Sequence, residues 1–418
     1  MKGYKECKAY LREKAKQVAE IAAEPVNRER LRQWKALNGM KPERPMFLMD
    51  QLPWAEMNVD DELTVKCEDS YMSLLEWQLM ETIYRHKYMP DDRVVEPAIQ
   101  IAKILEIKNM GIEIKMDALT NETMPTISAQ KYYDQIQNED DIDKYGFPVV
   151  VEYPEKTKEH YEIAIDIFYG ILDVQIQGCD VGCHAWDEIT YLRGAEQCIW
   201  DIVDKPEFMH RLVKRVFMVH HLLVDQLERL NAINTGYQFV HCSGAYTDEL
   251  PGFSNEPFNE LDRSTSKNVW TYGAAQLFSM VSPDMHNEFE IEYQIDWFRR
   301  FGIGYYGCCE PLDKKIHIIR RIPNIRKISM SPWADAANGA EQMAGDYVFS
   351  YKPSPAFLSS NAAWSEEGVR NALRSVIKEN ARYNNPVELI LKDVSTVGNR
   401  PDRLWQWAKI AREIVNEI

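Results

Sequence analysis

The sequence predicts an α/β fold in which parallel strands, each followed by a helix, close into a (β/α)8 TIM barrel. Short apolar strands alternate with longer helical segments through the second half of the chain, which is typical of parallel βα units. The 418 residues and 45% hydrophobic content allow one large core. No strand leads into a glycine-rich phosphate loop, which favours a barrel over an open, doubly wound nucleotide-binding sheet.

The N-terminus predicts a helical extension that precedes the barrel. Residues 2–38 show helical periodicity and are divided into two polar helices at Pro25. The run PMFLMDQLPW then predicts the first strand, with Asp50 and Gln51 in the loop that follows it. We therefore expect a helical extension over residues 1–45 and a single barrel domain over residues 46–418.

The second half supplies most of the expected strands. After Gly244 the chain is interpreted as an insertion, which ends at a helix over residues 282–302 with Ser282 as its N-cap and Pro283 in its first turn. Neighbouring parallel strands, whose carboxyl ends open on one pocket, are expected at residues 237–242, 303–308, 326–330, 346–350 and 387–391.

Composition excludes several classes of function. A net charge of -16 disfavours binding to nucleic acids and to anionic membranes. No apolar run is long enough to span a bilayer, and the charged N-terminus lacks the apolar core of a signal peptide. The eight cysteines are scattered and do not form a disulfide framework. These features predict a cytoplasmic protein with reduced thiols.

The most distinctive stretch is a short apolar strand that runs into Cys308, Cys309 and Glu310. Another predicted strand ends in His241 and Cys242. The carboxyl ends of parallel strands meet at one edge, where sites are built. Sulfur, imidazole and carboxylate groups are the ligands that zinc prefers. Strand alternation predicts that only one of Cys308 and Cys309 points into the barrel mouth, unless the chain turns sharply before Pro311, and that Cys242 points away from His241.

Several segments together resemble the uroporphyrinogen decarboxylase superfamily. They are LRGAEQCIWDIVDKPEFMHRLVKR (192–215), FSMVSPDMHNEFEIEYQIDWFRRFG (278–302), DYVFSYKPSPAFL (346–358) and VELILKDVSTVGNRPDRLWQWAKIARE (387–413). The last of these segments resembles the eighth strand and final helix of the corrinoid-dependent methyltransferase (O-demethylase-type) subgroup. The resemblance covers residues 170–418 well. Asp50 stands where decarboxylase members carry an arginine that binds carboxylates, which disfavours porphyrinogen decarboxylation.

The resemblance implies a zinc-assisted methyltransferase that moves a methyl group from a small methylated or methoxylated substrate to a corrinoid (cobalamin) on a separate protein. Zinc bound to the departing heteroatom would act as a Lewis acid. The family's H-x-C motif aligns with Gly307-Cys308-Cys309, so Cys309 matches the zinc cysteine and the histidine is missing. His241 is its expected substitute, and Cys308 and Glu310 complete the expected zinc ligands.

The remaining site residues are assigned by position near strand ends. Cys309, Glu310 and His241 are the expected catalytic residues, and the expected substrate-binding residues are Asp50, Gln51, Trp333, Tyr351 and Lys352. A metal-independent decarboxylase or lyase acting on another acid is the alternative, and a non-catalytic binding protein on the same barrel is a third hypothesis. The methyl donor, the direction of transfer and the oligomeric state stay open, with a homodimer among the alternatives.

Overall fold

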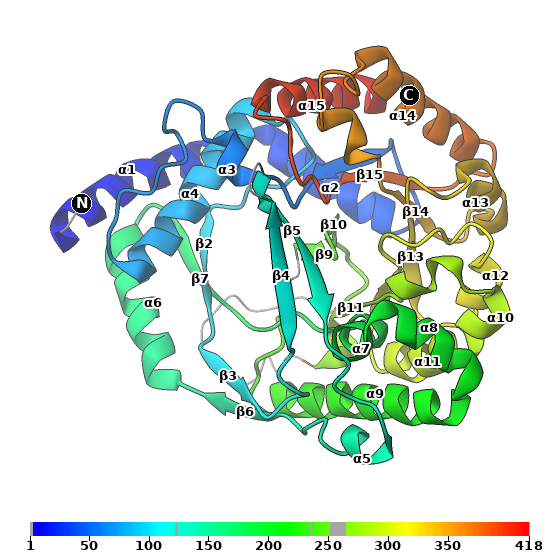
Figure 1. Ribbon diagram of the computed structural model, residues 1–418. Coiled ribbons are helices and arrows are strands. Elements are labelled where there is room, and N and C mark those ends of the chain that lie inside the picture. Colours follow the sequence, from blue (N-terminus) through cyan, green and yellow to red (C-terminus); the bar gives the residue numbers. More distant parts are fainter. Residues whose placement is uncertain (1–2, 122–123, 235, 237, 251–264, 418) are drawn as a thin grey trace.

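The computed structural model describes residues 3–121, 124–234, 236, 238–250 and 265–417. Figure 1 shows helices on the outside of a ring and strands within it. The helices are α1 Tyr4–Ala23, α2 Pro25–Asn38, α3 Trp54–Met57, α4 Ser70–Tyr88, α5 Glu139–Ile142, α6 Pro154–Phe168, α7 Ala185–Arg193, α8 Ala195–Asp204, α9 Pro206–Arg229, α10 Pro283–His286, α11 Glu292–Arg299, α12 Ile316–Ile319, α13 Ala336–Met343, α14 Glu366–Ala381 and α15 Pro401–Val415. Shorter helical turns are η1 Ser266–Asn268, η2 Gln276–Met280, η3 Asn287–Ile291 and η4 Pro355–Leu358.

A seven-stranded parallel sheet is the centre of the fold. Its order is β1-β15-β14-β13-β12-β11-β8. Its members are β1 Met46–Met49, β8 Gly182–Cys183, β11 Trp270–Gly273, β12 Ile303–Tyr306, β13 Ile325–Met330, β14 Val348–Tyr351 and β15 Val387–Leu391. Because all the pairings are parallel, the carboxyl ends of these strands lie at one edge.

The predicted neighbours β12, β13, β14 and β15 are confirmed, but the fifth predicted neighbour is wrong. Residues 239–240 form a short strand, β9 Phe239–Val240, that pairs antiparallel with β10 Ser243–Gly244 outside the sheet. The neighbour of β12 is instead β11, which lies in the segment interpreted as an insertion. Its sequence WTYG is short and ends in glycine, so it carries a weak strand signal of its own.

A second, smaller set of strands completes the first half of the chain. β2 Ala98–Ala102 pairs parallel with β7 Asp173–Gln177. Two antiparallel pairs join β3 Leu105–Lys108 to β6 Val149–Glu152 and β4 Met116–Asn121 to β5 Met124–Tyr132. Figure 1 shows the β4–β5 hairpin running across the middle of the ring. Among the described residues, no strand ladder joins β1 or β8 to the β2–β7 pair, so closure of an eight-stranded barrel stays a prediction.

The two N-terminal helices form as the sequence predicts and then pack into the core. Pro25 separates α1 from α2, and Gly39 caps the end of α2. Trp34 of α2 is fully buried in a cluster with residues of β1, β14 and β15. A Cβ on Gly244 would lie 2.6 Å from the indole ring of Trp34, so glycine permits this close approach. The extension therefore contributes directly to the packing of the sheet's inner face.

Two further observations bear on the classes excluded above. Within the described part of the chain, no helix is both long and apolar enough to cross a membrane. All eight cysteines are free thiols.

Candidate active site

The backbone turns sharply at Gly307, directly after β12. The φ of Gly307 is +92°, a conformation that strains any residue with a Cβ. A Cβ there would also lie 2.4 Å from Cδ1 of Leu312. The turn ends the alternation of the strand, and the sulfurs of Cys308 and Cys309 lie 3.5 Å apart. The sharp turn is the exception that the sequence allowed, and it places both thiols at the same strand end.

The pKa of Cys308 is lowered, chiefly by the neighbouring Cys309, and the side chain lies beside a buried cation. Its side chain is buried, and Nζ of Lys392, just past β15, donates to its Sγ over 3.1 Å. The S–H of Cys309 lowers the pKa of Cys308, burial opposes that shift, and His241 and Lys392 lower the pKa further. Burial alone would lower the pKa of Lys392, but the Cys308 thiolate raises it overall. The pair is a thiolate–ammonium ion pair at the sheet edge.

Cys309 has the complementary role of a protonated thiol. Its Sγ donates to Oδ2 of Asp393 over 3.2 Å and lies beside the sulfur of Cys308. The neighbouring thiolate and then burial raise the pKa of Cys309. Asp393 also lies 3.3 Å from Nζ of Lys392. Lys392 and Asp393 thus bring a cation and an anion from the end of β15 to the two sulfurs.

Glu310 is buried, and its carboxylate faces backbone groups. Its two oxygens accept hydrogen bonds from the backbone N–H of Cys308, over 2.9 Å, and of Ala275, over 3.3 Å. Burial, and then the negative Cys308, raise the pKa of Glu310 to about 7. In this arrangement Glu310 joins the loop after β12 to the loop after β11.

His241 and Cys242 lie in a tight turn and not in an extended strand. They are the two loop residues between β9 and β10, with φ of 45° and 67°. Positive φ at both central positions is the mark of a type I′ hairpin, which favours Asn-Gly. Histidine and cysteine at these positions are strained, and such strain clusters at functional sites. The predicted alternation of Cys242 with His241 does not apply here.

The ring of His241 lies between two tyrosines close to Cys308. Its centroid is 5.3 Å from the ring of Tyr272 and 5.3 Å from that of Tyr305. Burial lowers the pKa of His241, whereas Cys308 opposes that shift. Its Nε2 is buried and has no hydrogen-bond partner. The structure therefore brings His241 and Cys308 together, but through this hairpin turn and not through the neighbouring parallel strand that the sequence predicts.

Asp50 and Gln51 lie at the same edge of the sheet. The backbone N–H of Asp50 donates to the carbonyl of Leu391, the last residue of β15, over 2.9 Å. Burial and the nearby Asp50 raise the pKa of Cys242 to about 12. Gln51 is exposed, and its carbonyl accepts the N–H of Val394 over 3.2 Å. The first loop therefore borders the group formed by Cys242, Lys392 and Asp393.

The three other predicted substrate-binding residues differ in burial. Trp333 is 79% exposed and Tyr351 is half-buried. Lys352 is buried, and its Nζ donates to the hydroxyl of Tyr305 and, over 2.8 Å, to Oγ of Ser350. Burial lowers the pKa of Lys352 to about 8. Lys352 is therefore a titratable group beside the thiolate, whereas Trp333 is at the surface.

The four predicted zinc ligands do not assemble a metal site in this arrangement. The two sulfurs are soft donors at close range, and the orphaned Nε2 of His241 is a suitable third donor by chemistry. Both carboxylate oxygens of Glu310, however, accept hydrogen bonds from backbone N–H groups. Among the described residues, no three His, Cys, Asp or Glu side chains are gathered closely enough to hold a metal ion.

Lys392 and Asp393 are the site residues that sequence reasoning missed. They follow a predicted strand, VELIL, in the way that the two cysteines follow β12. Their position at the carboxyl end of a parallel strand was a usable signal. Tyr272, on the missed strand β11, had no such signal.

Comparison with known proteins does not identify a family. The chain matches no family model, and no curated protein sequence matches it. A solved methyltransferase from Methanosarcina mazei is similar over 91% of this chain and 97% of that chain, with a TM-score of 0.46 and 10% sequence identity. These values are too low to assign a fold family or an activity, so the superfamily resemblance stays a prediction.

Proposed function

We propose that this protein is a methyltransferase that takes a methyl group from a small methylated or methoxylated substrate and delivers it to a corrinoid on a separate protein. The observation that carries the proposal is the buried Cys308 thiolate beside Lys392 at the carboxyl edge of the sheet. A thiolate is both a soft nucleophile and a soft metal ligand, and each property serves the movement of a methyl group. The segment resemblance to corrinoid-dependent methyltransferases supports the same chemistry.

In this proposal each residue of the site has its own role. Cys308 lies next to the methyl group, and Lys392 keeps its sulfur ionised. Lys352, with a pKa of about 8, is largely protonated at neutral pH and is the proton donor to the departing oxygen or nitrogen. Glu310 fixes the loop by its two backbone hydrogen bonds. The corrinoid, when bound, supplies the cobalt that accepts the methyl group.

Zinc is a separable part of the hypothesis. Cys308 and Cys309 offer two neighbouring sulfurs, but among the described residues no three His, Cys, Asp or Glu side chains are close enough together to hold a metal ion. The roles given above to Cys308, Lys352 and Lys392 therefore do not depend on zinc. Metal analysis of the purified protein decides this part: one zinc per chain, lost in a Cys308→Ser/Cys309→Ser double variant, would add the metal to the site.

A decarboxylase or lyase acting on a carboxylic acid is the second candidate. Lys352 and Lys392 are two buried ammonium groups close to the same thiolate, and an ammonium pair is suited to bind a carboxylate. Under this alternative the substrate would lose carbon dioxide and no methyl group would reach a corrinoid.

The test is a methyl-transfer assay with free cob(I)alamin and a panel of methoxyarenes, methylamines and methanol. We expect methylcobalamin to form with at least one of them, and Cys308→Ser to reduce the rate at least about 100-fold because a hydroxyl stays protonated. The Cys309→Ser variant measures separately how much the sulfur of Cys309 contributes to the rate. The matched control is Cys198→Ser, at a buried cysteine of α8. Full activity in Cys308→Ser would contradict the proposal.

A further inference from the structure

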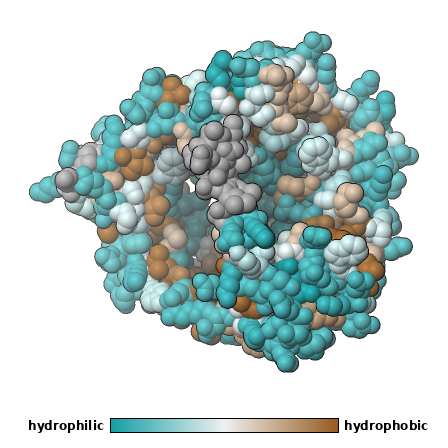
Figure 2. Space-filling view, in the orientation of Figure 1, coloured by the Kyte–Doolittle hydropathy of each residue, from teal (hydrophilic) through white to brown (hydrophobic). Residues whose placement is uncertain are grey.

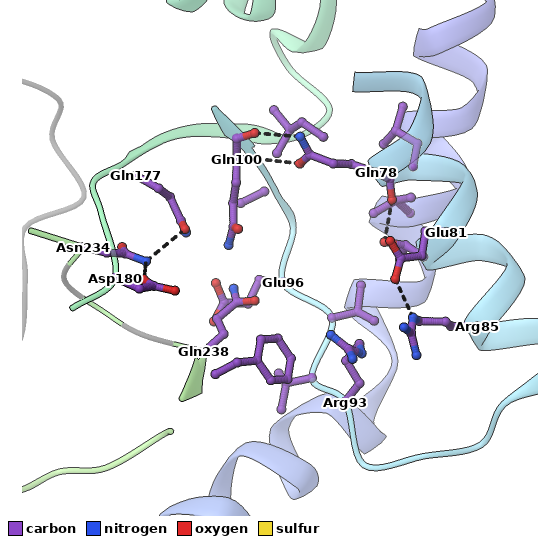
Figure 3. A pocket seen from close by; sticks show the side chains of 18 residues that line it. Gln78, Glu81, Arg85, Arg93, Glu96, Gln100, Gln177, Asp180, Asn234 and Gln238 are labelled. Carbon is purple, nitrogen blue, oxygen red and sulfur yellow. Dashed lines mark hydrogen bonds and ion pairs between the residues drawn. The ribbon is translucent and has the colours of Figure 1, made fainter. Parts of the chain in front are cut away.

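A polar cavity of about 350 Å³ lies beside the β2–β7 pair. Its walls come from α4, the segment 93–96, β2, the end of β7 and the residues around β9. Figure 3 shows the side chains that converge on it, and Figure 2 shows that this face of the molecule is hollowed left of its centre. A cavity of this size is in the range of small-molecule sites. Nothing in the proposed methyl transfer uses it.

Amide side chains form much of the lining. They are Gln78, Gln100, Gln177, Asn234 and Gln238. Two of them are committed to structure: Gln78 pairs with the backbone of Gln100, and Asn234 donates to Oδ1 of Asp180 over 2.8 Å. The side chain of Gln238 is hydrogen-bonded to that of Glu96. The side chain of Gln100 forms no hydrogen bond within the described chain and is free to bind a polar ligand.

Two carboxylates on one side of the cavity have no cationic partner. Figure 3 shows Glu96 and Asp180 near each other, on the side of Gln177 and Asn234. In the described structure, no lysine, arginine or histidine nitrogen lies within ion-pair distance of either one. Burial raises the pKa of Glu96 and of Asp180. Glu96 is half-buried and Asp180 is exposed, so both are accessible to a ligand, and two like charges on one wall favour a cation between them.

The opposite side of the cavity carries two arginines, of which one is neutralised. Arg85 forms an ion pair with Glu81 over 2.7 Å and lies 3.9 Å from Asp91. Arg93 forms no ion pair with any described carboxylate; it donates to the carbonyl of Met49 over 3.3 Å and stacks on Phe239 at 4.3 Å. Its buried Nε has no hydrogen-bond partner, and burial lowers its pKa. Arg93 therefore leaves a positive charge on this side of the cavity that no described carboxylate neutralises.

We propose that the cavity is a binding site for a small zwitterion, such as an amino acid, whose ammonium group is held by Glu96 and Asp180 and whose carboxylate is held by Arg93. Each of these three groups lacks a partner of opposite charge among the described residues, and they are arranged with opposite signs on opposite sides of one cavity. A cation alone would leave Arg93 unpaired, and an anion alone would leave the two carboxylates unpaired. The amide of Gln100 adds a hydrogen bond to either end of the ligand, and the amide of Gln238 supports Glu96.

Calorimetric titration of the whole chain with a matched set of probes tests this proposal. The probes are 4-aminobutanoate, which carries both charges, butylammonium, which carries only the positive charge, and butanoate, which carries only the negative charge. Glycine, 3-aminopropanoate and 6-aminohexanoate vary the distance between the charges. We expect at least one zwitterion of the series to bind, and the single-charge probes to bind at least about tenfold more weakly than 4-aminobutanoate or its best homologue.

Variants then locate the binding. Glu96→Gln and Asp180→Asn preserve the shape of the side chain, and each should weaken binding of the best zwitterion at least about tenfold. Arg93→Gln should weaken it similarly, with a thermal melt to confirm folding. The control is Glu341→Gln, an exposed residue of α13 away from the cavity. Equal affinity for all three charge types, no binding by any zwitterion at millimolar concentration, or full affinity in the two isosteric variants would overturn the proposal.

The readout is binding and not turnover, so this result is separate from the methyl-transfer assay. Failure of the titration would leave the Cys308 site as proposed. Failure of the cob(I)alamin assay would leave the cavity as a binding site.

Discussion

The inner face of β12 to β15 and the polar cavity beside β2 both hold charged groups, but the two regions partner those charges differently. On the inner face the cations are hydrogen-bonded: Lys327 donates to Glu388 over 2.8 Å, Lys392 to Cys308 over 3.1 Å, and Lys352 to the hydroxyls of Tyr305 and Ser350. In the cavity, Arg93, Glu96 and Asp180 have no charged partner among the described residues.

This difference indicates two kinds of site. Charges that are already paired and hydrogen-bonded are preorganised, so their surroundings need little rearrangement during a reaction. Charges left unpaired in a cavity cost free energy until a ligand neutralises them. The inner face therefore resembles reaction machinery, and the cavity resembles a receptor for a charged molecule.

The largest expected effect is the loss of a paired charge from the inner face. Lys327 and Glu388 are both fully buried, and Lys327 also donates to Oγ of Ser243 and the carbonyl of Gly244. Lys327→Met should lower the free energy of unfolding by about 3–5 kcal/mol, because it leaves a buried carboxylate unpaired. Urea denaturation measures this, and Lys327→Met/Glu388→Gln should recover part of the loss. A loss below about 1 kcal/mol would mean that the pair is not important for stability.

Lys352 predicts a pH dependence of stability. Its pKa is lowered from 10.5 to about 8 by burial, so between these values the unfolded chain binds more protons than the folded protein. The free energy of unfolding should therefore gain roughly 3 kcal/mol from this group as the pH rises from 8 to 10.5. The measurement is the difference between wild type and Lys352→Met across that range. Parallel curves for the two proteins would show that Lys352 titrates normally.

Removing an unpaired charge from the cavity should have the opposite sign to the Lys327 change. Without ligand, Glu96→Gln and Asp180→Asn should leave the free energy of unfolding unchanged or raise it by up to about 1 kcal/mol, because each change removes one of two neighbouring negative charges. Chemical denaturation at neutral pH checks this. A loss above about 1 kcal/mol would show that these carboxylates already have partners and would remove the contrast between the two regions.

The smallest effect on stability is expected for Trp333, at the surface near the carboxyl edge of the sheet. Trp333 follows β13 and is 79% exposed, so Trp333→Ala should change the free energy of unfolding by less than about 0.5 kcal/mol. If its indole binds substrate as the sequence predicts, KM should rise in the same variant while kcat is little changed. An unchanged KM would separate Trp333 from the active site.

Local patterns in the sequence were sufficient for several elements that hold the candidate site. The apolar runs of β12, β13, β14 and β15 indicated strands, and their alternation with helices indicated parallel pairing. Pro25 and Ser282 marked helix starts that the structure has. These signals are legible because backbone hydrogen bonding and apolar periodicity act over short stretches of chain. For the same reason Cys308 and Cys309 could be placed at a strand end from sequence alone.

The partners of those side chains were decided by the tertiary structure. Lys392 and Cys308 are 84 residues apart, and only the parallel register of the sheet brings them together. Gly307 and the turn at His241 and Cys242 changed which side chains face the site, through backbone conformations that strand alternation does not predict. Nothing in the sequence distinguishes Arg93, Glu96 and Asp180 from other charged residues. Only the tertiary structure shows whether a charged side chain has a partner of opposite charge nearby.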